Sequence, residues 1–122
     1  MITIEEMQVI LDELAEEFPQ EFYKELNGGI LLLPDIKVSP EARNHDLYIL
    51  GQYQYSHSMG RYIIIYFGSF SALYGYGSRE KLKKELRKTL RHEFTHHLEH
   101  LVGEKDLEVE DQKELDRYKG KF

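Results

Sequence analysis

The sequence contains no cysteine, so it can form neither a disulfide bond nor a zinc site with thiolate ligands. It has no long hydrophobic run either: the longest, Tyr62–Phe67, falls far short of the roughly 20 residues that cross a bilayer. The first residues lack the basic and apolar regions of a signal peptide. These absences are typical of a reducing compartment, and we expect a cytoplasmic protein without a membrane partner.

Positive charge is also scarce. The 16 lysines and arginines are outnumbered by 22 aspartates and glutamates, which gives a net charge of −6. The one basic stretch, residues 81–91, is balanced by acids elsewhere, whereas nucleic-acid-binding proteins normally cluster basic residues on one face. We therefore expect no nucleic acid as partner.

The residues that are present form the composition of an ordinary globular domain. The chain has 122 residues, of which 41% are hydrophobic and 31% are charged, enough for one domain with a modest core. No repeat, low-complexity segment or linker divides it, so we expect residues 1–122 to form a single domain. The sequence does not indicate an oligomeric state.

The most informative stretch is the motif His92-Glu93-x-x-His96. On a helix, residues four apart lie on one face, so the two imidazoles can hold one tetrahedral Zn²⁺ together with a third protein ligand. The intervening Glu93 lies close enough to take a proton from a water activated by the metal. The motif therefore predicts a zinc hydrolase with His92 and His96 as ligands and Glu93 as general base. The same donors also suit other divalent transition metals.

The motif falls in a segment with a helical pattern of apolar residues. These recur every three or four positions and form one stripe, made of Leu82, Leu86, Leu90, Phe94, Leu98 and Leu101. His92 lies about 200° around the helix from Phe94, so we expect the histidines to face away from the core, toward a cleft. Ser78 is expected to cap this helix over residues 79–102, and Gly103 to end it.

The rest of the chain supplies further helices and a sheet. Thr3, in a capping box with Glu6, begins a predicted helix over residues 3–18. A short second helix and three strands follow, at residues 20–26, 30–33, 47–55 and 61–67. The last two strands should form a hairpin, and the glycine-rich residues 68–77 a connection that covers the core edge or lines the cleft. The sequence thus predicts an α+β fold in which a small three- to four-stranded sheet packs against the long helix and the N-terminal helices.

The order of these elements, together with four short stretches, resembles the small bacterial zincin-like metallopeptidase family over nearly the whole chain. The stretches are Phe18-Pro19-Gln20-Glu21-Phe22, Leu50-Gly51-Gln52-Tyr53, Ile63–Phe67 and His92-Glu93-Phe94-Thr95-His96-His97. The resemblance implies a zincin-like fold, a bound zinc ion and hydrolysis of peptide bonds in peptides or unfolded proteins. We expect an extended substrate to pair with an exposed strand edge, that of the strand Arg61–Phe67.

The sequence departs from the family where the third ligand is expected. The family pattern extends to H-E-x-x-H-H-x-G-x-x-D, whose final Asp is the proposed third ligand. Here Glu99 stands in place of the Gly and Val102 in place of the Asp. One extra helical turn before Gly103 accounts for this difference and moves the third ligand downstream.

Three downstream carboxylates are candidates for that ligand. Asp106 reaches back to the metal only if the chain after the helix is fully extended, whereas Glu108 and Asp111 have slack. Asp111 best resembles the final Asp of the family pattern, so it is our first candidate, ahead of Glu108 and Asp106.

The histidines beside the motif are predicted to play other roles. His100 would have to approach the metal nearly in line with His92 and His96, which tetrahedral zinc disfavours, so we expect it not to be a ligand. His97 points about 100° away from His96 and is expected to be packed or hydrogen-bonded.

Two hypotheses about function follow from the sequence. The first is a zinc metallopeptidase in which Glu93 is the general base. The second is a domain of the same fold that binds metal or peptide with little or no turnover, which the displaced third ligand favours. A purely structural helix with accidental histidines is disfavoured by Glu93 at the position that the chemistry requires.

Overall fold

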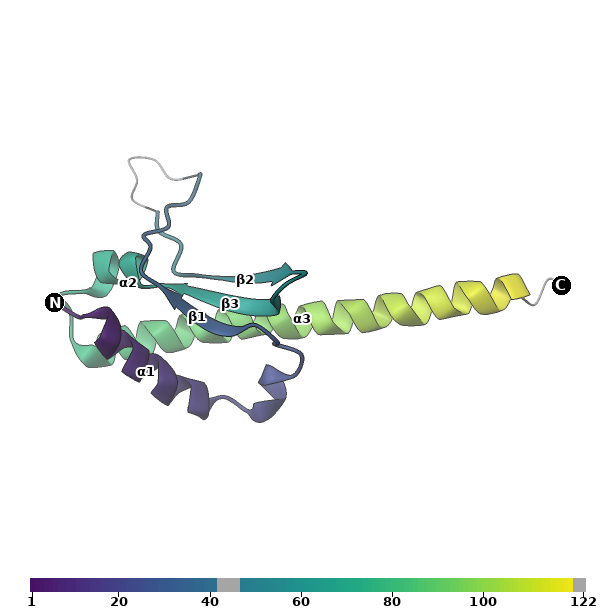
Figure 1. Cartoon of the computed structure of the whole chain (residues 1–122), viewed down its shortest axis with the longest axis horizontal. Coiled ribbons are helices and arrows are strands. Elements are labelled where there is room, and N and C mark those ends of the chain that lie inside the picture. The colour runs from purple at the N-terminus through teal and green to yellow at the C-terminus, as the bar shows by residue number, and fades with distance from the viewer. Residues whose placement is uncertain (42–46, 120–122) are drawn as a thin grey trace.

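The computed structural model of the protein describes residues 1–41 and 47–119, and describes side chains as far as residue 104. The elements, in chain order, are α1 (Ile4–Glu17), the 3-10 helix η1 (Gln20–Tyr23), β1 (Gly29–Leu33), β2 (Gly51–Ser56), β3 (Gly60–Tyr66), α2 (Phe67–Tyr74) and α3 (Arg79–Lys119) (Figure 1). The predicted α+β class with a small sheet is confirmed. No helix in the described part of the chain is long and apolar enough to cross a membrane.

The sheet has three strands, with β3 in the centre. β3 pairs in parallel with β1 on one side and antiparallel with β2 on the other. The predicted hairpin of the second and third strands is therefore confirmed. The prediction that residues 61–67 offer a free edge is wrong, because β1, distant in sequence, pairs with the side of β3 that β2 leaves open. Among the described strands, β2 carries the free edge beside α3.

The core lies between the sheet and two helices, α1 and α3, which run along the same side of it (Figure 1). Four residues of the predicted stripe on α3 are at most 1% exposed: Leu82, Leu86, Leu90 and Phe94. They pack against Met7, Ile10, Leu11 and Leu14 of α1 and against Ile63 and Ile65 of β3. Burying side chains of this size stabilises the fold by roughly 1.5–3 kcal/mol each, so the stripe fixes which face of α3 turns inward.

Both predicted N-terminal caps are present. Thr3 Oγ1 accepts a hydrogen bond of 3.1 Å from the Glu6 N–H at the start of α1. Ser78 Oγ accepts one of 3.1 Å from the Lys81 N–H at the start of α3. Each cap satisfies a backbone donor that has no partner within the helix, so the two helices begin where the sequence predicts.

The structure corrects the ends of several predicted elements. The helix predicted over residues 20–26 is a single 3-10 turn, and the strand predicted over 47–55 begins only at Gly51, after an isolated bridge between Val38 and Tyr48. The sequence predicts a connection at residues 68–77, but most of these residues form the helix α2. Phe70 in α2 is fully buried in the core, and this burial stabilises a helix that the glycines alone would disfavour.

The glycine at the start of α2 has a packing role. A Cβ on Gly68 would lie 2.7 Å from the backbone carbonyl of Asp35. Glycine therefore lets α2 lie against the chain that follows β1. Its role here is to allow two backbone segments to approach closely, not to make the chain flexible.

The predicted end of the long helix at Gly103 is wrong. α3 continues through this residue to Lys119 and projects well beyond the sheet (Figure 1). A glycine inside an exposed helix costs about 1 kcal/mol relative to alanine, which is not enough to stop a helix between segments that favour one.

Candidate metal centre

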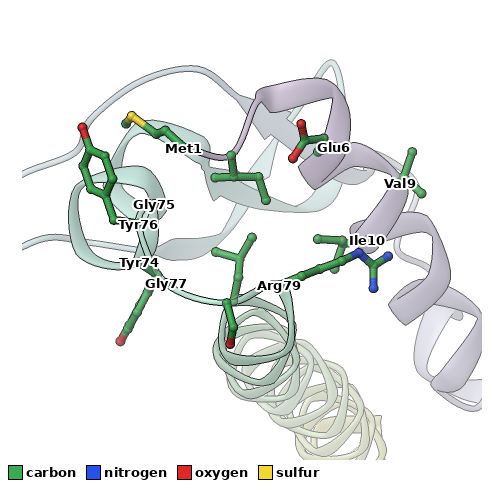
Figure 2. Close-up of a pocket in the computed structure, with 12 residues that line it drawn as sticks. Met1, Glu6, Val9, Ile10, Tyr74, Gly75, Tyr76, Gly77 and Arg79 are labelled. Carbon is green, nitrogen blue, oxygen red and sulfur yellow. The ribbon is translucent and has the colours of Figure 1, made fainter.

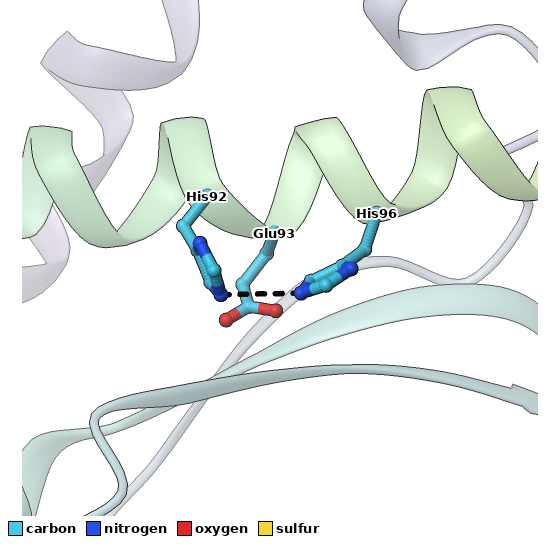
Figure 3. Close-up of side chains that lie close together, drawn as sticks. All are labelled: His92, Glu93 and His96. Carbon is cyan, nitrogen blue, oxygen red and sulfur yellow. Dashed lines mark hydrogen bonds between the residues drawn. The ribbon is translucent and has the colours of Figure 1, made fainter.

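The three motif residues lie together on α3, and their side chains point from the helix toward the strands (Figure 3). The Nε2 atoms of His92 and His96 are 3.1 Å apart, and the two rings stand nearly perpendicular, at 85°. One ligand atom from each imidazole and from the Glu93 carboxylate fits within a span of 4.8 Å. The three residues of the predicted motif are thus brought into one cluster.

The spacing of the two imidazoles fits a shared metal ion. Two nitrogens bound to tetrahedral zinc at about 2.0–2.1 Å lie about 3.3 Å from each other. The observed distance between the two Nε2 atoms is 3.1 Å. A small rotation of either ring would make up the difference. Both histidines are exposed, so an ion reaches them without any movement of the helix.

Glu93 occupies a different environment from the histidines beside it. Its side chain is 5% exposed, and no hydrogen bond to it is present among the described residues. Burial raises the pKa of the Glu93 carboxyl, while His92 and His96 act in the opposite direction. A carboxylate that is largely removed from water, yet faces an open pocket, is a stronger proton acceptor than an exposed one, which is the property that a general base requires.

The edge of the sheet formed by β2 lies next to this cluster. The Tyr66 N–H donates to the Leu50 carbonyl at 3.0 Å, which makes these two residues a bonded pair of the antiparallel ladder. Because such pairs alternate, the backbone N–H and C=O groups of Gly51, Tyr53 and Tyr55 point away from β3. The edge therefore offers three residues to an extended chain.

His97 is packed and hydrogen-bonded, as the sequence predicts. Its ring is fully buried, its Nε2–H donates to the Lys24 carbonyl at 2.8 Å, and its Nδ1 accepts from the Tyr53 hydroxyl at 2.8 Å. The carbonyl only accepts, so it fixes which ring nitrogen carries the proton. Burial lowers the pKa of His97, so the neutral ring ties α3 to the edge strand and to the chain after η1. The sequence offered no signal for the two partners.

His100 is engaged elsewhere. Its Nε2 lies 2.7 Å from a carboxylate oxygen of Glu104, and the other oxygen of Glu104 pairs with Arg61 of β3. Hydrogen bonding from His100 is the main reason that the pKa of Glu104 is lowered. His100 is not part of the cluster around His92.

The candidates for the third ligand lie outside the described side chains. Asp111, Glu108 and Asp106 all follow residue 104, so the choice among them stays a prediction. Among the side chains that the structure describes, only Glu93 adds a carboxylate to the two imidazoles.

A pocket of about 520 Å³ opens directly beside His92 and Glu93. Its walls are the chain before and at the start of β2 and the neighbouring turns of α3. The lining residues are Tyr48, Ile49, Leu50, Gly51, Glu85, Lys88, Thr89, His92 and Glu93.

A second cavity, of about 580 Å³, lies at the N-terminal ends of α1 and α3 (Figure 2). Its charged lining residues are Glu6 and Arg79, and Arg79 donates to Glu13 at 3.0 Å. This cavity shares no residue with the pocket beside His92 and brings together no set of groups that suggests chemistry.

Comparisons with known proteins place the chain among its relatives. A scan against models of protein families finds no match, and neither does a search of curated proteins. Among solved structures, a conserved hypothetical protein from T. thermophilus superposes with a TM-score of 0.69 and is 32% identical in sequence. The match covers 84% of this chain and 99% of that one. At this identity over almost the whole of the other protein, the chain belongs to the same family as that conserved hypothetical protein.

Proposed function

We propose that the protein is a zinc-dependent metallopeptidase of zincin-like fold that cleaves peptides or unfolded proteins. The observation that carries the proposal is the cluster on α3: two exposed imidazoles whose Nε2 atoms are 3.1 Å apart, and a buried carboxylate between them. A helix face that only meets solvent would leave its carboxylates exposed, whereas Glu93 is largely removed from water, which costs free energy.

In this proposal the two histidines bind the metal and Glu93 transfers the proton. His92 and His96 would hold the ion through Nε2 as neutral rings. A zinc ion bound there supplies a Lewis acid that polarises the scissile carbonyl and acidifies a water molecule. Glu93 takes a proton from the attacking water and delivers it to the nitrogen of the leaving amine as the C–N bond breaks.

The edge strand gives this chemistry an extended substrate. The outward N–H and C=O groups of Gly51, Tyr53 and Tyr55 can pair with a peptide lying along β2, between the strand and α3. Hydrogen bonds to the main chain do not depend on the side chains of the bound peptide. This kind of binding therefore suits a peptidase that acts on unfolded chains of many sequences.

The first test is the metal content of untagged protein purified without a chelator, measured by elemental analysis. We expect about one zinc per chain in the wild type and a loss of zinc in His96→Ala, because one of two imidazoles is removed. His57→Ala is the matched control, since His57 is exposed in the turn between β2 and β3 and should leave zinc unchanged. A protein that takes up no zinc at micromolar concentration would refute the proposal.

The second test separates metal binding from chemistry. Glu93→Gln should keep its zinc and lose hydrolysis of an unfolded protein such as reduced casein, because the amide cannot accept the proton. Glu99→Gln is the control, since Glu99 is an exposed acid on the same helix. If Glu93→Gln cleaved as fast as the wild type, Glu93 would not be the general base.

A domain that binds metal or peptide without turnover is the second candidate function. The observation in its favour is that the described side chains bring no third protein ligand to the two imidazoles besides Glu93. Stoichiometric zinc together with no cleavage of unfolded protein by the wild type would favour this candidate over a peptidase.

A further inference from the structure

The pocket beside His92 and Glu93 has an apolar middle and a charged far end. Thr89 donates its hydroxyl to the Glu85 carbonyl at 3.0 Å, which leaves its methyl group facing Gly51. A Cβ on Gly51 would lie only 2.9 Å from that methyl carbon, so the strand and the helix approach closely there. On the side of Thr89 away from His92, the pocket is lined by two charged residues of α3, Glu85 and Lys88.

The direction of β2 decides which part of a substrate enters this pocket. The start of the strand lies over Thr89, at Gly51, while Tyr53 reaches His97 further along α3. β2 and α3 therefore run in the same direction. A peptide paired antiparallel with β2 runs the opposite way, so its residues after the scissile bond pass from the His92 cluster toward Thr89 and into the pocket.

The charged end of the pocket is formed by Glu85 and Lys88, and Lys81, outside the lining, pairs with the same Glu85 carboxylate. Glu85 is already engaged: one of its oxygens accepts from Lys81 at 3.2 Å and the other from the Tyr74 hydroxyl at 3.4 Å. Hydrogen bonding from Lys81 keeps the pKa of Glu85 low, so this carboxylate is ionised and satisfied. The ammonium of Lys88 forms only a long ion pair with Glu85, at 3.9 Å, and its side chain is 69% exposed, so it can turn toward a ligand.

Lys88 lies at the right distance to select a substrate residue. It precedes His92 by four residues, which is about 6 Å along the helix axis. An extended chain advances about 3.3 Å per residue, so the backbone of Lys88 lies level with the second residue after the scissile bond, within reach of its long side chain. On the basis of the metallopeptidase function proposed above, we propose that this pocket binds the part of the substrate after the scissile bond and selects a carboxylate there through Lys88. That carboxylate is an Asp or Glu side chain, or the C-terminal carboxylate of a short peptide.

The test is digestion of a proteome-derived peptide library by the zinc-loaded enzyme, with every cut read by mass spectrometry. We expect Asp and Glu to be enriched about threefold over Gln and Asn in the two positions after the cut, the size of an exposed ion pair. Lys88→Glu should reverse the enrichment and favour Lys and Arg. Lys84→Glu is the matched control, one helical turn further from the site, and should keep the preference of the wild type. In 0.5 M salt the preference should weaken, because exposed charges are screened.

Synthetic peptides separate the two sources of the carboxylate. One pair differs by Glu or Gln after the scissile bond, and a second pair has a free or an amidated C-terminus two residues after it. A faster cut of the Glu peptide alone assigns a side chain, and a faster cut of the free C-terminus alone assigns the terminal carboxylate. Equal rates within both pairs, or a preference that survives Lys88→Glu, would overturn the inference while leaving the peptidase intact. If no peptide is cut by zinc-loaded wild type, the proposed function itself fails.

Discussion

Replacing Glu93 with Gln should stabilise the metal-free protein at neutral pH, because burial disfavours the charged form of the carboxyl. In the folded chain it is 5% exposed and has no hydrogen-bond partner among the described residues. Burial raises the pKa of its carboxyl above the usual 4.5. The folded state therefore keeps a proton that the unfolded state releases first, so the stability linked to this group is present at low pH and is lost as pH rises through the folded pKa.

The size of the effect follows from the cost of partly desolvating a charge, since the Gln amide is polar but uncharged. Removing the charge should raise the free energy of unfolding by about 1 kcal/mol near pH 7, or about 4 °C in Tm for a domain of this length. Thermal unfolding of chelator-treated wild type and Glu93→Gln, followed by circular dichroism from pH 4 to pH 8, measures it. The difference should shrink toward pH 4, and Glu99→Gln should show no gain because Glu99 is exposed. A Glu93→Gln protein that melts at or below the wild-type temperature at pH 7 would refute the reasoning.

Three further substitutions test the surroundings of the site. Gly51→Ala should lower the free energy of unfolding by about 1–3 kcal/mol, read from the urea midpoint, because the new Cβ would lie 2.9 Å from the Thr89 methyl carbon; an unchanged midpoint would contradict the close approach. Tyr53→Phe should cost about 1 kcal/mol in the same assay, because buried His97 loses the donor to its Nδ1; a cost near zero would mean that the bond contributes nothing. Gly103→Ala should raise Tm by the equivalent of about 1 kcal/mol, since open space surrounds this helical glycine; a lower Tm would mean that the helix is interrupted there.

The features that the sequence predicted well are those set by short-range patterns. The apolar stripe on α3 identified its buried face from Leu82 to Phe94, and the same periodicity placed His92 and His96 away from the core. Spacing along one helix is a local property, so the cluster of the two imidazoles and Glu93 could be predicted from five residues.

The features that the sequence missed depend on pairing between distant segments. Nothing in the strand Gly60–Tyr66 shows that β1 will pair with it in parallel, and this pairing makes β3 the central strand and β1 and β2 the two edges. The partners of His97 lie on β2 and after η1, far away in the chain. Gly68 is one reason to predict a connection at residues 68–77. The structure shows instead that a glycine is required there because α2 approaches the backbone of Asp35.

The structure of α3 near Gly103 decides whether a downstream carboxylate could serve as the third metal ligand. In the continuous helix, the backbone at Asp111 lies fifteen residues beyond His96, about 22 Å along the axis. A carboxylate from this part of the chain can therefore join the two imidazoles only if the helix breaks, and Gly103 is where a break costs least. Metal binding would then have to offset the lost helical hydrogen bonds, so zinc should reduce the helical signal, and Gly103→Ala should weaken zinc binding up to about fivefold. If zinc leaves the helicity unchanged and Gly103→Ala binds it as tightly as the wild type, the downstream carboxylates are not ligands. The two imidazoles with Glu93 would then be the whole protein contribution to the site.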